Sequence, residues 1–194
     1  MLPPSIRQCA NRSTSTEFMA LVLPGAVADL DELDSLEDLK FEGTDICIRT
    51  GTVITPPLFS AFGGRRWLEE FSAPPRPKQH VKKHRSTFLD GVLTAIRALT
   101  DSNTSSVIGF GEGGLIAGGV VSPEIRALAY KERRVGDSES ASLESFCTSI
   151  LQHVLIVAPA SNPHKSYMTL LRECVPELSS VTIPCLSCRL PATL

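Results

Sequence analysis

Four of the six residues from 109 to 114 are glycine, and this cluster separates two apolar segments of different character. Val107 and Ile108 precede it as part of a short segment of strand type, and an apolar segment of helical type follows over about 115–121. Glycine is favoured where the backbone takes a conformation that other residues avoid, or where two backbone segments come very close. The cluster therefore predicts a tight strand-to-helix turn.

The rest of the chain alternates in the same way between strand-like and helix-like segments. Continuous apolar runs predict strands at 18–23, 45–49, 153–158 and 181–186. Apolar residues at three- and four-residue spacing predict helices at 88–99 and 164–178, and a short helix or turn at 29–39. Ser122 followed by Pro123 is typical of a further helix start, and Ser86 or Thr87 is expected to cap the helix at 88–99. Loops are expected at 50–57, 72–85 and 136–142. This order predicts an α/β fold, in which a mostly parallel sheet has helices on both faces.

The length and composition fit one globular domain. The chain has 194 residues, of which 42% are hydrophobic and 21% charged. We expect a loose lead-in over residues 1–17 and a single domain over 18–194. No apolar run is long enough to cross a membrane, and the first residues lack the pattern of a secretory signal, so a cytoplasmic protein is expected. A net charge of -2 argues against nucleic acid as a partner.

The six cysteines do not form a recognisable metal or disulfide pattern. They are scattered, which is typical of reduced, partly buried thiols. Cys185 and Cys188 form a C-x-x-C pair near the end of the chain, but a zinc site needs a second pair of ligands. We therefore predict no metal and no cofactor.

Two kinds of chemistry use glycines in a strand-to-helix turn, and the first is dinucleotide binding. Gly109, Gly111 and Gly114 match the pattern G-x-G-x-x-G, in which the backbone approaches a pyrophosphate at the start of a helix. Glu132 would then be the acid that binds the ribose. Against this interpretation, the dinucleotide turn normally opens its domain, whereas two predicted strands and a helix precede the cluster here.

The second chemistry is the nucleophile elbow of serine hydrolases, G-x-S-x-G. Gly109 and Gly113 stand at the two glycine positions, and Gly111 stands where the serine would be. Glycine has no side chain with which to attack a substrate. The pattern thus predicts the turn of a hydrolase without its reactive atom.

The stretch from Ile108 to Ala117, I-G-F-G-E-G-G-L-I-A, resembles the elbow of small carboxylesterases, acyl-protein thioesterases and related fungal serine hydrolases, which read G-F-S-Q-G-G there. The segment 21–25 resembles their first strand and the loop that supplies an oxyanion-hole amide. The segment 64–68 resembles their tryptophan segment, and 153–163 resembles their acid-bearing strand. The resemblance covers about residues 18–186, and it implies a three-layer α/β-hydrolase sandwich. The backbone of Gly25, Ala26, Gly111 and Glu112 would then line an oxyanion-type pocket, with Trp67 and His164 as lining candidates.

All three catalytic roles are vacant in this comparison. Gly111 replaces the nucleophile, Asn162 stands at the acid position, and no histidine follows His164 to act as the base. The side chain of Glu112 is expected to face solvent or the mouth of the pocket, and His153 is expected to be a structural histidine. The leading hypothesis is a catalytically degenerate domain that binds a small carboxylate or acyl ligand, or a protein partner. The alternatives are an active esterase or thioesterase with a relocated nucleophile, and a dinucleotide-binding domain.

Overall fold

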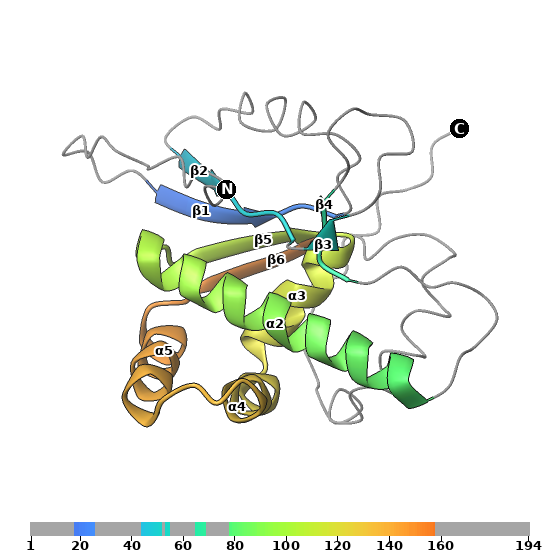
Figure 1. Cartoon of the computed structure of the whole chain (residues 1–194). Coiled ribbons are helices and arrows are strands. Elements are labelled where there is room, and N and C mark those ends of the chain that lie inside the picture. Colours follow the sequence, from blue (N-terminus) through green and yellow to red (C-terminus); the bar gives the residue numbers. More distant parts are fainter. Residues whose placement is uncertain (1–17, 26–43, 52, 55–64, 69–77, 158–194) are drawn as a thin grey trace, which may run out of the picture.

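The computed structural model describes residues 18–25, 44–51, 53–54, 65–68 and 78–157 (Figure 1). These residues include the glycine cluster and most of the elements that flank it. The strand predicted at 181–186 and the helices predicted at 29–39 and 164–178 lie outside the described residues.

Four parallel strands form the central sheet. They are β1 (Phe18–Leu23), β2 (Thr44–Ile48), β5 (Ser106–Phe110) and β6 (His153–Val157), in the spatial order β2-β1-β5-β6. Every neighbouring pair is parallel, and Val22 of β1 lies opposite Ile108 of β5, which lies opposite Leu155 of β6. Parallel strands need crossover connections, and those from β2 to β5 and from β5 to β6 contain helices, so the predicted α/β fold is confirmed.

A second, very short pair of strands lies beside the sheet. The strands β3 (Val53–Ile54) and β4 (Arg65–Arg66) pair in antiparallel fashion. The prediction of a loop over 50–57 was therefore wrong at residues 53–54. Gly51 allows the approach, because a Cβ atom at this position would lie 1.9 Å from the carbonyl oxygen of Arg66.

Four helices are described, and two of them differ from the prediction. They are α2 (Lys78–Ser102), α3 (Glu112–Val121), α4 (Pro123–Glu132) and α5 (Asp137–Ser149). Helix α2 starts within the predicted loop at 72–85, so neither Ser86 nor Thr87 caps it. Both His84 and Phe88 are buried, which shows that its packed face extends further back than the predicted start.

Helix α5 replaces the loop predicted at 136–142. Its apolar stripe contains only Leu143, Phe146 and Cys147, all of which are buried, and the rest of the helix is rich in serine and glutamate. Asp137 and Glu139 lie in its first turn, where negative charge is favourable. By contrast, the predicted start of α4 is confirmed, because the hydroxyl of Ser122 accepts a hydrogen bond from the amide of Ile125 at 3.3 Å.

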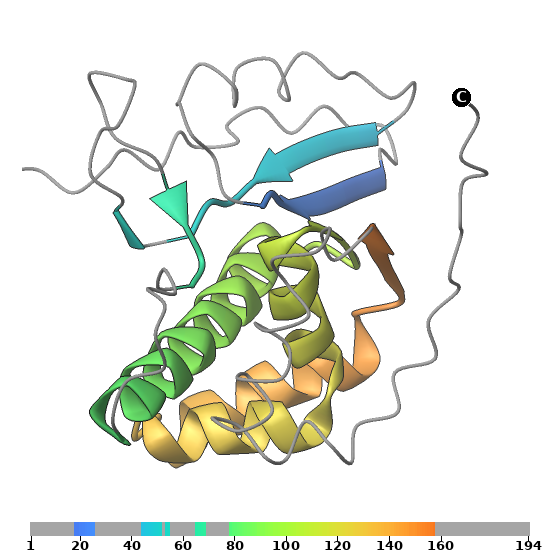
Figure 2. The ribbon, with the colours of Figure 1, turned by 90° about the vertical axis from the view of Figure 1, so that its right-hand side faces the viewer.

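All four described helices lie on one side of the sheet (Figures 1 and 2). Side chains that point to this side from alternate strand positions are buried in the core, as at Leu21, Leu23 and Val107, and they join Trp67 and residues of α2, α3, α4 and α5. The opposite side of β6 is exposed, since Leu155 retains 49% of its accessible surface. The continuous apolar run at 153–158 is typical of a strand buried on both faces, and this expectation was wrong for Leu155 and for His153, which is also exposed.

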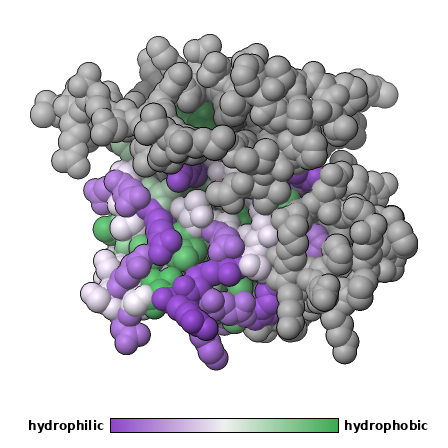
Figure 3. All heavy atoms as spheres, viewed as in Figure 1, coloured by the Kyte–Doolittle hydropathy of each residue, from purple (hydrophilic) through white to green (hydrophobic). Residues whose placement is uncertain are grey.

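Hydrophilic side chains cover much of the outer surface of the helical layer (Figure 3). Ion pairs between helices contribute to this surface, such as those from Arg97 of α2 to Glu139 of α5 and from Arg85 of α2 to Glu132 of α4. No described helix is both long and apolar enough to cross a membrane.

Candidate functional site at the strand-to-helix turn

Gly111 forms a sharp turn between β5 and α3. Its φ is 52° and its ψ is -117°, close to the first central position of a type II′ turn, where glycine predominates. The amide of Gly114 donates to the carbonyl oxygen of Gly111 at 3.1 Å and closes the first turn of the helix. The structure thus has the tight strand-to-helix turn that the glycine cluster predicts, with positive φ at Gly111.

Close backbone contacts explain two further glycines of the cluster. A Cβ atom at Gly109 would lie 2.5 Å from the carbonyl oxygen of Gly113, and one at Gly113 would lie 2.0 Å from that of Leu23. At Gly114 the nearest atom would be a side-chain methyl group of Ile156 at 3.0 Å, which is able to shift. Positions 109, 111 and 113 are therefore the ones at which a side chain would be tolerated least. This is the spacing of G-x-S-x-G, whereas G-x-G-x-x-G leaves position 113 free.

The end of β1 brings Gly25 against the turn. A Cβ atom at Gly25 would lie 3.5 Å from the carbonyl oxygen of Phe110 and 3.9 Å from the amide nitrogen of Glu112, and one at Gly111 would lie 3.5 Å from the Cα of Gly25. The backbone at Gly25, Gly111 and Glu112, which the sequence analysis proposed as one site, is therefore brought together. Ala26 lies outside the described residues.

This position is also where the strand order of the sheet reverses. From β1 the chain passes to β2 on one side, whereas β5, on the other side of β1, leads to β6 further away. In open α/β sheets ligands bind at such a switch point, beyond the carboxyl ends of the strands. Gly25 follows the carboxyl end of β1 and Gly111 follows that of β5, so the topology independently indicates the same location.

The start of α3 presents backbone donors here. Within the described part of the chain, the amides of Glu112 and Gly113 donate to no backbone carbonyl. The first amides of a helix have no acceptor within the helix, and its dipole favours negative charge at this end. A carboxylate or a similar anion is the ligand that such a group of amides suits.

The side chain of Glu112 does not face solvent, contrary to our expectation. It is 3% exposed, and its two carboxylate oxygens accept hydrogen bonds from Arg66 and from the backbone of Trp67. The Arg66 contacts are 3.0 Å from Nε and 2.5 Å from Nη2, and the Trp67 amide lies at 3.1 Å. This carboxylate is occupied within the protein and is poorly placed to act as a catalytic acid.

Trp67 belongs to the core. It is 1% exposed, and its indole Nε1 donates to the carbonyl oxygen of Pro24 at 2.9 Å. Its contact with the site thus runs through the loop after β1. The other two residues singled out by the resemblance, Asn162 and His164, lie outside the described residues.

Arg66 is the residue that the sequence analysis missed. It lies 46 positions before Glu112, and nothing in the sequence pairs the two. The nearest signal was the segment 64–68, which was singled out for its tryptophan rather than for the arginine beside it.

The acid of the dinucleotide alternative is engaged elsewhere. Glu132 is the last residue of α4, and its carboxylate accepts a hydrogen bond from Nε of Arg85 at 2.7 Å. It therefore joins two helices and does not stand at the tip of a strand, where a ribose-binding acid is expected.

Other reactive groups of the described chain do not converge on the turn. Neither Cys47 nor Cys147 forms a disulfide bond, and burial raises the pKa of Cys147 to about 11, so the Cys147 thiol is a poor nucleophile at neutral pH. His153 begins β6 and lies 3.4 Å from the hydroxyl of Ser106, which begins β5. Both residues therefore lie at the amino ends of their strands, whereas the turn lies at the carboxyl ends. The described residues contain no group of three or more metal-ligating side chains.

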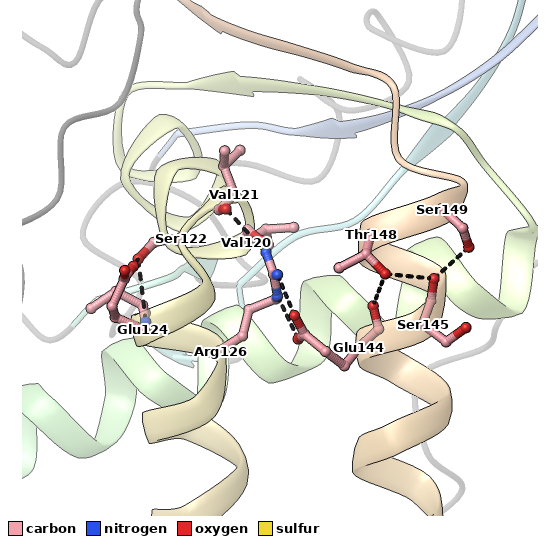
Figure 4. A network of polar contacts seen from close by, with 10 residues as sticks. Val120, Val121, Ser122, Glu124, Arg126, Glu144, Ser145, Thr148 and Ser149 are labelled. Atoms are coloured by element: carbon pink, nitrogen blue, oxygen red, sulfur yellow. Dashed lines mark hydrogen bonds and ion pairs between the residues drawn. The ribbon is translucent and has the colours of Figure 1, made fainter.

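A second polar cluster joins α4 to α5 on the far side of the helical layer (Figure 4). Arg126 is 3% exposed, and it makes two hydrogen bonds to the carboxylate of Glu144, at 2.8 Å and 2.5 Å. It also donates to the carbonyl oxygens of Val120 and Val121 at the end of α3. Since every one of these contacts is internal, the cluster is a structural link between three helices.

Comparison with known proteins adds no family to this description. No family model matches the chain, and no curated protein matches it in sequence.

Proposed function

We propose that this chain is a hydrolase-like α/β domain without a nucleophile, which acts by binding or scaffolding at the carboxyl ends of β1 and β5. The observation that carries the proposal is the conformation of Gly111, which has φ of 52° and ψ of -117° at a strand-to-helix turn flanked by two sterically required glycines. The resemblance of residues 108–117 to a nucleophile elbow and the close-packed positions 109 and 113 support the same interpretation.

The proposed ligand is a small carboxylate or acyl compound. The amides of Glu112 and Gly113 at the start of α3 suit a negatively charged or strongly polar oxygen. A partner protein that presents a carboxylate would use the same amides. The reversal of strand order beside Gly25 and Gly111 supports a binding role at this position.

Hydrolysis is not part of the proposal, because acyl transfer needs a nucleophile and a base. The residues whose backbones meet at the turn are Gly25, Phe110, Gly111 and Glu112, and none of them carries a hydroxyl, thiol or imidazole. The carboxylate of Glu112 is already bound by Arg66. An active esterase would have to use a nucleophile from elsewhere in the chain.

Two measurements on the full chain test the proposal. Titration with butyrate, followed by the amide resonances of a ¹⁵N-labelled sample, should give saturable shifts centred on Gly25, Gly111, Glu112 and Gly113. The resonance of Gly136, which has no atom within 4 Å of its Cβ position, is the internal control. Absence of shifts at the turn would contradict the binding role.

The second measurement addresses the catalytic alternative. The protein is incubated with a fluorophosphonate probe and, separately, with short-chain ester and thioester substrates. We expect neither labelling nor hydrolysis above a heat-denatured control. Stoichiometric labelling would refute the non-catalytic proposal and would identify the relocated nucleophile by mass spectrometry.

A further inference from the structure

Three elements are tied together at the proposed site by two consecutive residues, Arg66 and Trp67. The guanidinium of Arg66 and the backbone amide of Trp67 bind the carboxylate of Glu112 at the start of α3. The indole of Trp67 binds the carbonyl oxygen of Pro24, immediately after β1. One short segment therefore contacts both sides of the turn region, at the end of β1 and at the start of α3.

The segment is itself held in place by backbone packing. Arg66 pairs with Val53 in the two-stranded sheet, and its carbonyl oxygen would lie 1.9 Å from a Cβ atom at Gly51. Gly51 follows shortly after β2, so the segment packs against the stretch of chain that leaves this strand of the main sheet. A side chain supported in this way holds its partners in a defined geometry.

The Arg66–Glu112 ion pair also sets the net charge beside the first amides of α3. Glu112 is the first residue of α3, and its buried carboxylate would repel an anion that approaches the same amides. Arg66 makes two hydrogen bonds to this carboxylate, so the pair is close to neutral as a unit. Without Arg66, the negative charge would be left beside the ligand and partly desolvated.

We infer that Arg66 is a positioning residue of the proposed site, which neutralises Glu112 and, together with Trp67, fixes the start of α3 against the end of β1. This inference rests on the proposed function for its ligand, but the geometric part stands on contacts that exist without any ligand.

The geometric part is tested by hydrogen exchange in the ligand-free protein. In Arg66→Met, exchange of the amides of Gly114 and Leu115 should be about tenfold faster, because the first turn of α3 opens locally, while Val120 and Val121 keep their protection. The matched control is Arg97→Met, since Arg97 also pairs with a glutamate but lies at the surface. An equal change along all of α3, or none, would overturn the positioning role.

Two further variants keep the test decisive if Arg66→Met folds poorly. Glu112→Gln leaves one acceptor oxygen, which serves either Arg66 or the Trp67 amide but not both, so the amides of Gly114 and Leu115 should exchange faster while Val120 and Val121 keep their protection. Trp67→Phe removes the indole donor to Pro24 together with part of a buried side chain, and it should shift the amide resonance of Gly25 while leaving that of Gly114 nearly unchanged. Failure of both patterns would contradict the inference.

The electrostatic part is tested by comparing butyrate with the neutral analogue butyramide. Arg66→Met should weaken butyrate binding about fivefold more than butyramide binding. In the double variant with Glu112→Gln, the ratio of the two affinities should return to that of the native protein, because the unpaired negative charge of Glu112 has been removed. If the native protein binds neither compound but the exchange pattern appears, the proposed function fails and the positioning role of Arg66 remains. If butyrate binds and Arg66→Met leaves both affinities unchanged, the inference fails and the proposed function remains.

Discussion

At the scale of single residues, the turn contains two positions, Gly113 and Gly111, at which a side chain would be costly for different reasons. Gly113 faces the backbone of β1, so a Cβ atom meets a carbonyl oxygen that cannot move without displacing the strand. A Cβ atom at Gly111 would make only an ordinary van der Waals contact, 3.5 Å from the Cα of Gly25, but the backbone conformation is one that L-residues avoid. Gly136 has neither constraint, since its φ is -61° and nothing lies near it.

These differences predict an order of alanine substitutions. Gly113→Ala should lower the free energy of unfolding by about 3 kcal/mol or more, because the strand and helix must separate. Gly111→Ala should cost about 1–2 kcal/mol through backbone strain alone. Gly136→Ala should stay within about 0.5 kcal/mol. Urea denaturation measures all three, and equal values for Gly111→Ala and Gly136→Ala would contradict the positive-φ turn.

The buried thiol of Cys147 predicts a loss of stability at high pH. Burial raises its pKa from 9.0 to about 11, so the folded state holds the proton more tightly than the unfolded state. The resulting stabilisation is complete below pH 9 and is lost as the pH rises towards 11, by about 1–2 kcal/mol. The free energy of unfolding, measured by denaturation between pH 8 and about 11, should therefore fall less with pH in Cys147→Ala than in the native protein. A parallel pair of curves would be the contrary result.

Single residues also show how much of the site the sequence could predict. Gly109, Gly111 and Gly113 were identified because a turn between adjacent segments leaves its mark within a few residues. Arg66 was not, because its partner is 46 positions away and a buried ion pair has no local pattern. The burial of Glu112 was missed for the same reason, since the residue that accounts for it lies in another element.

At the scale of elements, the two arginine–glutamate pairs that reach α5 differ in burial. Arg126 of α4 is 3% exposed and also binds the last carbonyl groups of α3, whereas the side chain of Arg97 of α2 is 48% exposed. A buried charge that loses its partner remains desolvated, but an exposed one returns to water.

This contrast predicts unequal effects of matched substitutions. Glu144→Gln should destabilise the protein by about 3 kcal/mol, because it leaves Arg126 without its bidentate partner in the interior. Glu139→Gln, which affects only the exposed pair, should change the free energy of unfolding by about 0.5 kcal/mol or less. Chemical denaturation of both variants at one ionic strength gives the comparison, and similar losses would show that Arg126 is hydrated in solution.

Elements with strong periodicity could be predicted, and those with weak periodicity could not. The strand Phe18–Leu23 and the start of α4 at Ser122 and Pro123 follow from local signals, namely a continuous apolar run and a capping pair. Helix α5 was missed because its thirteen residues bury only Leu143, Phe146 and Cys147. Its helical state depends on packing against α2 and on the link from Arg126, neither of which is local.

At the scale of the whole molecule, the parallel sheet was predictable but the order of its strands was not. Alternating strands and helices indicate a parallel sheet because parallel strands require crossovers. The position of β1 between β2 and β5 depends instead on contacts between residues far apart in the chain, such as Val22 with Ile108. The reversal of strand order that supports the proposed site therefore became visible only in the structure.

The orientation of the layers can be tested on β6, where neighbouring residues face opposite sides of the sheet. Ile156 packs against the core, and its methyl group would meet a Cβ atom at Gly114 of α3, whereas Leu155 faces away and is 49% exposed. Ile156→Lys should cost about 2 kcal/mol or more, because it places an ammonium group beneath the helical layer. Leu155→Lys should change the free energy of unfolding by about 0.5 kcal/mol or less. Thermal and urea denaturation measure both variants, and the reverse order would mean that α3 covers the other face of the sheet, in which case the start of α3 could not lie beside Gly25.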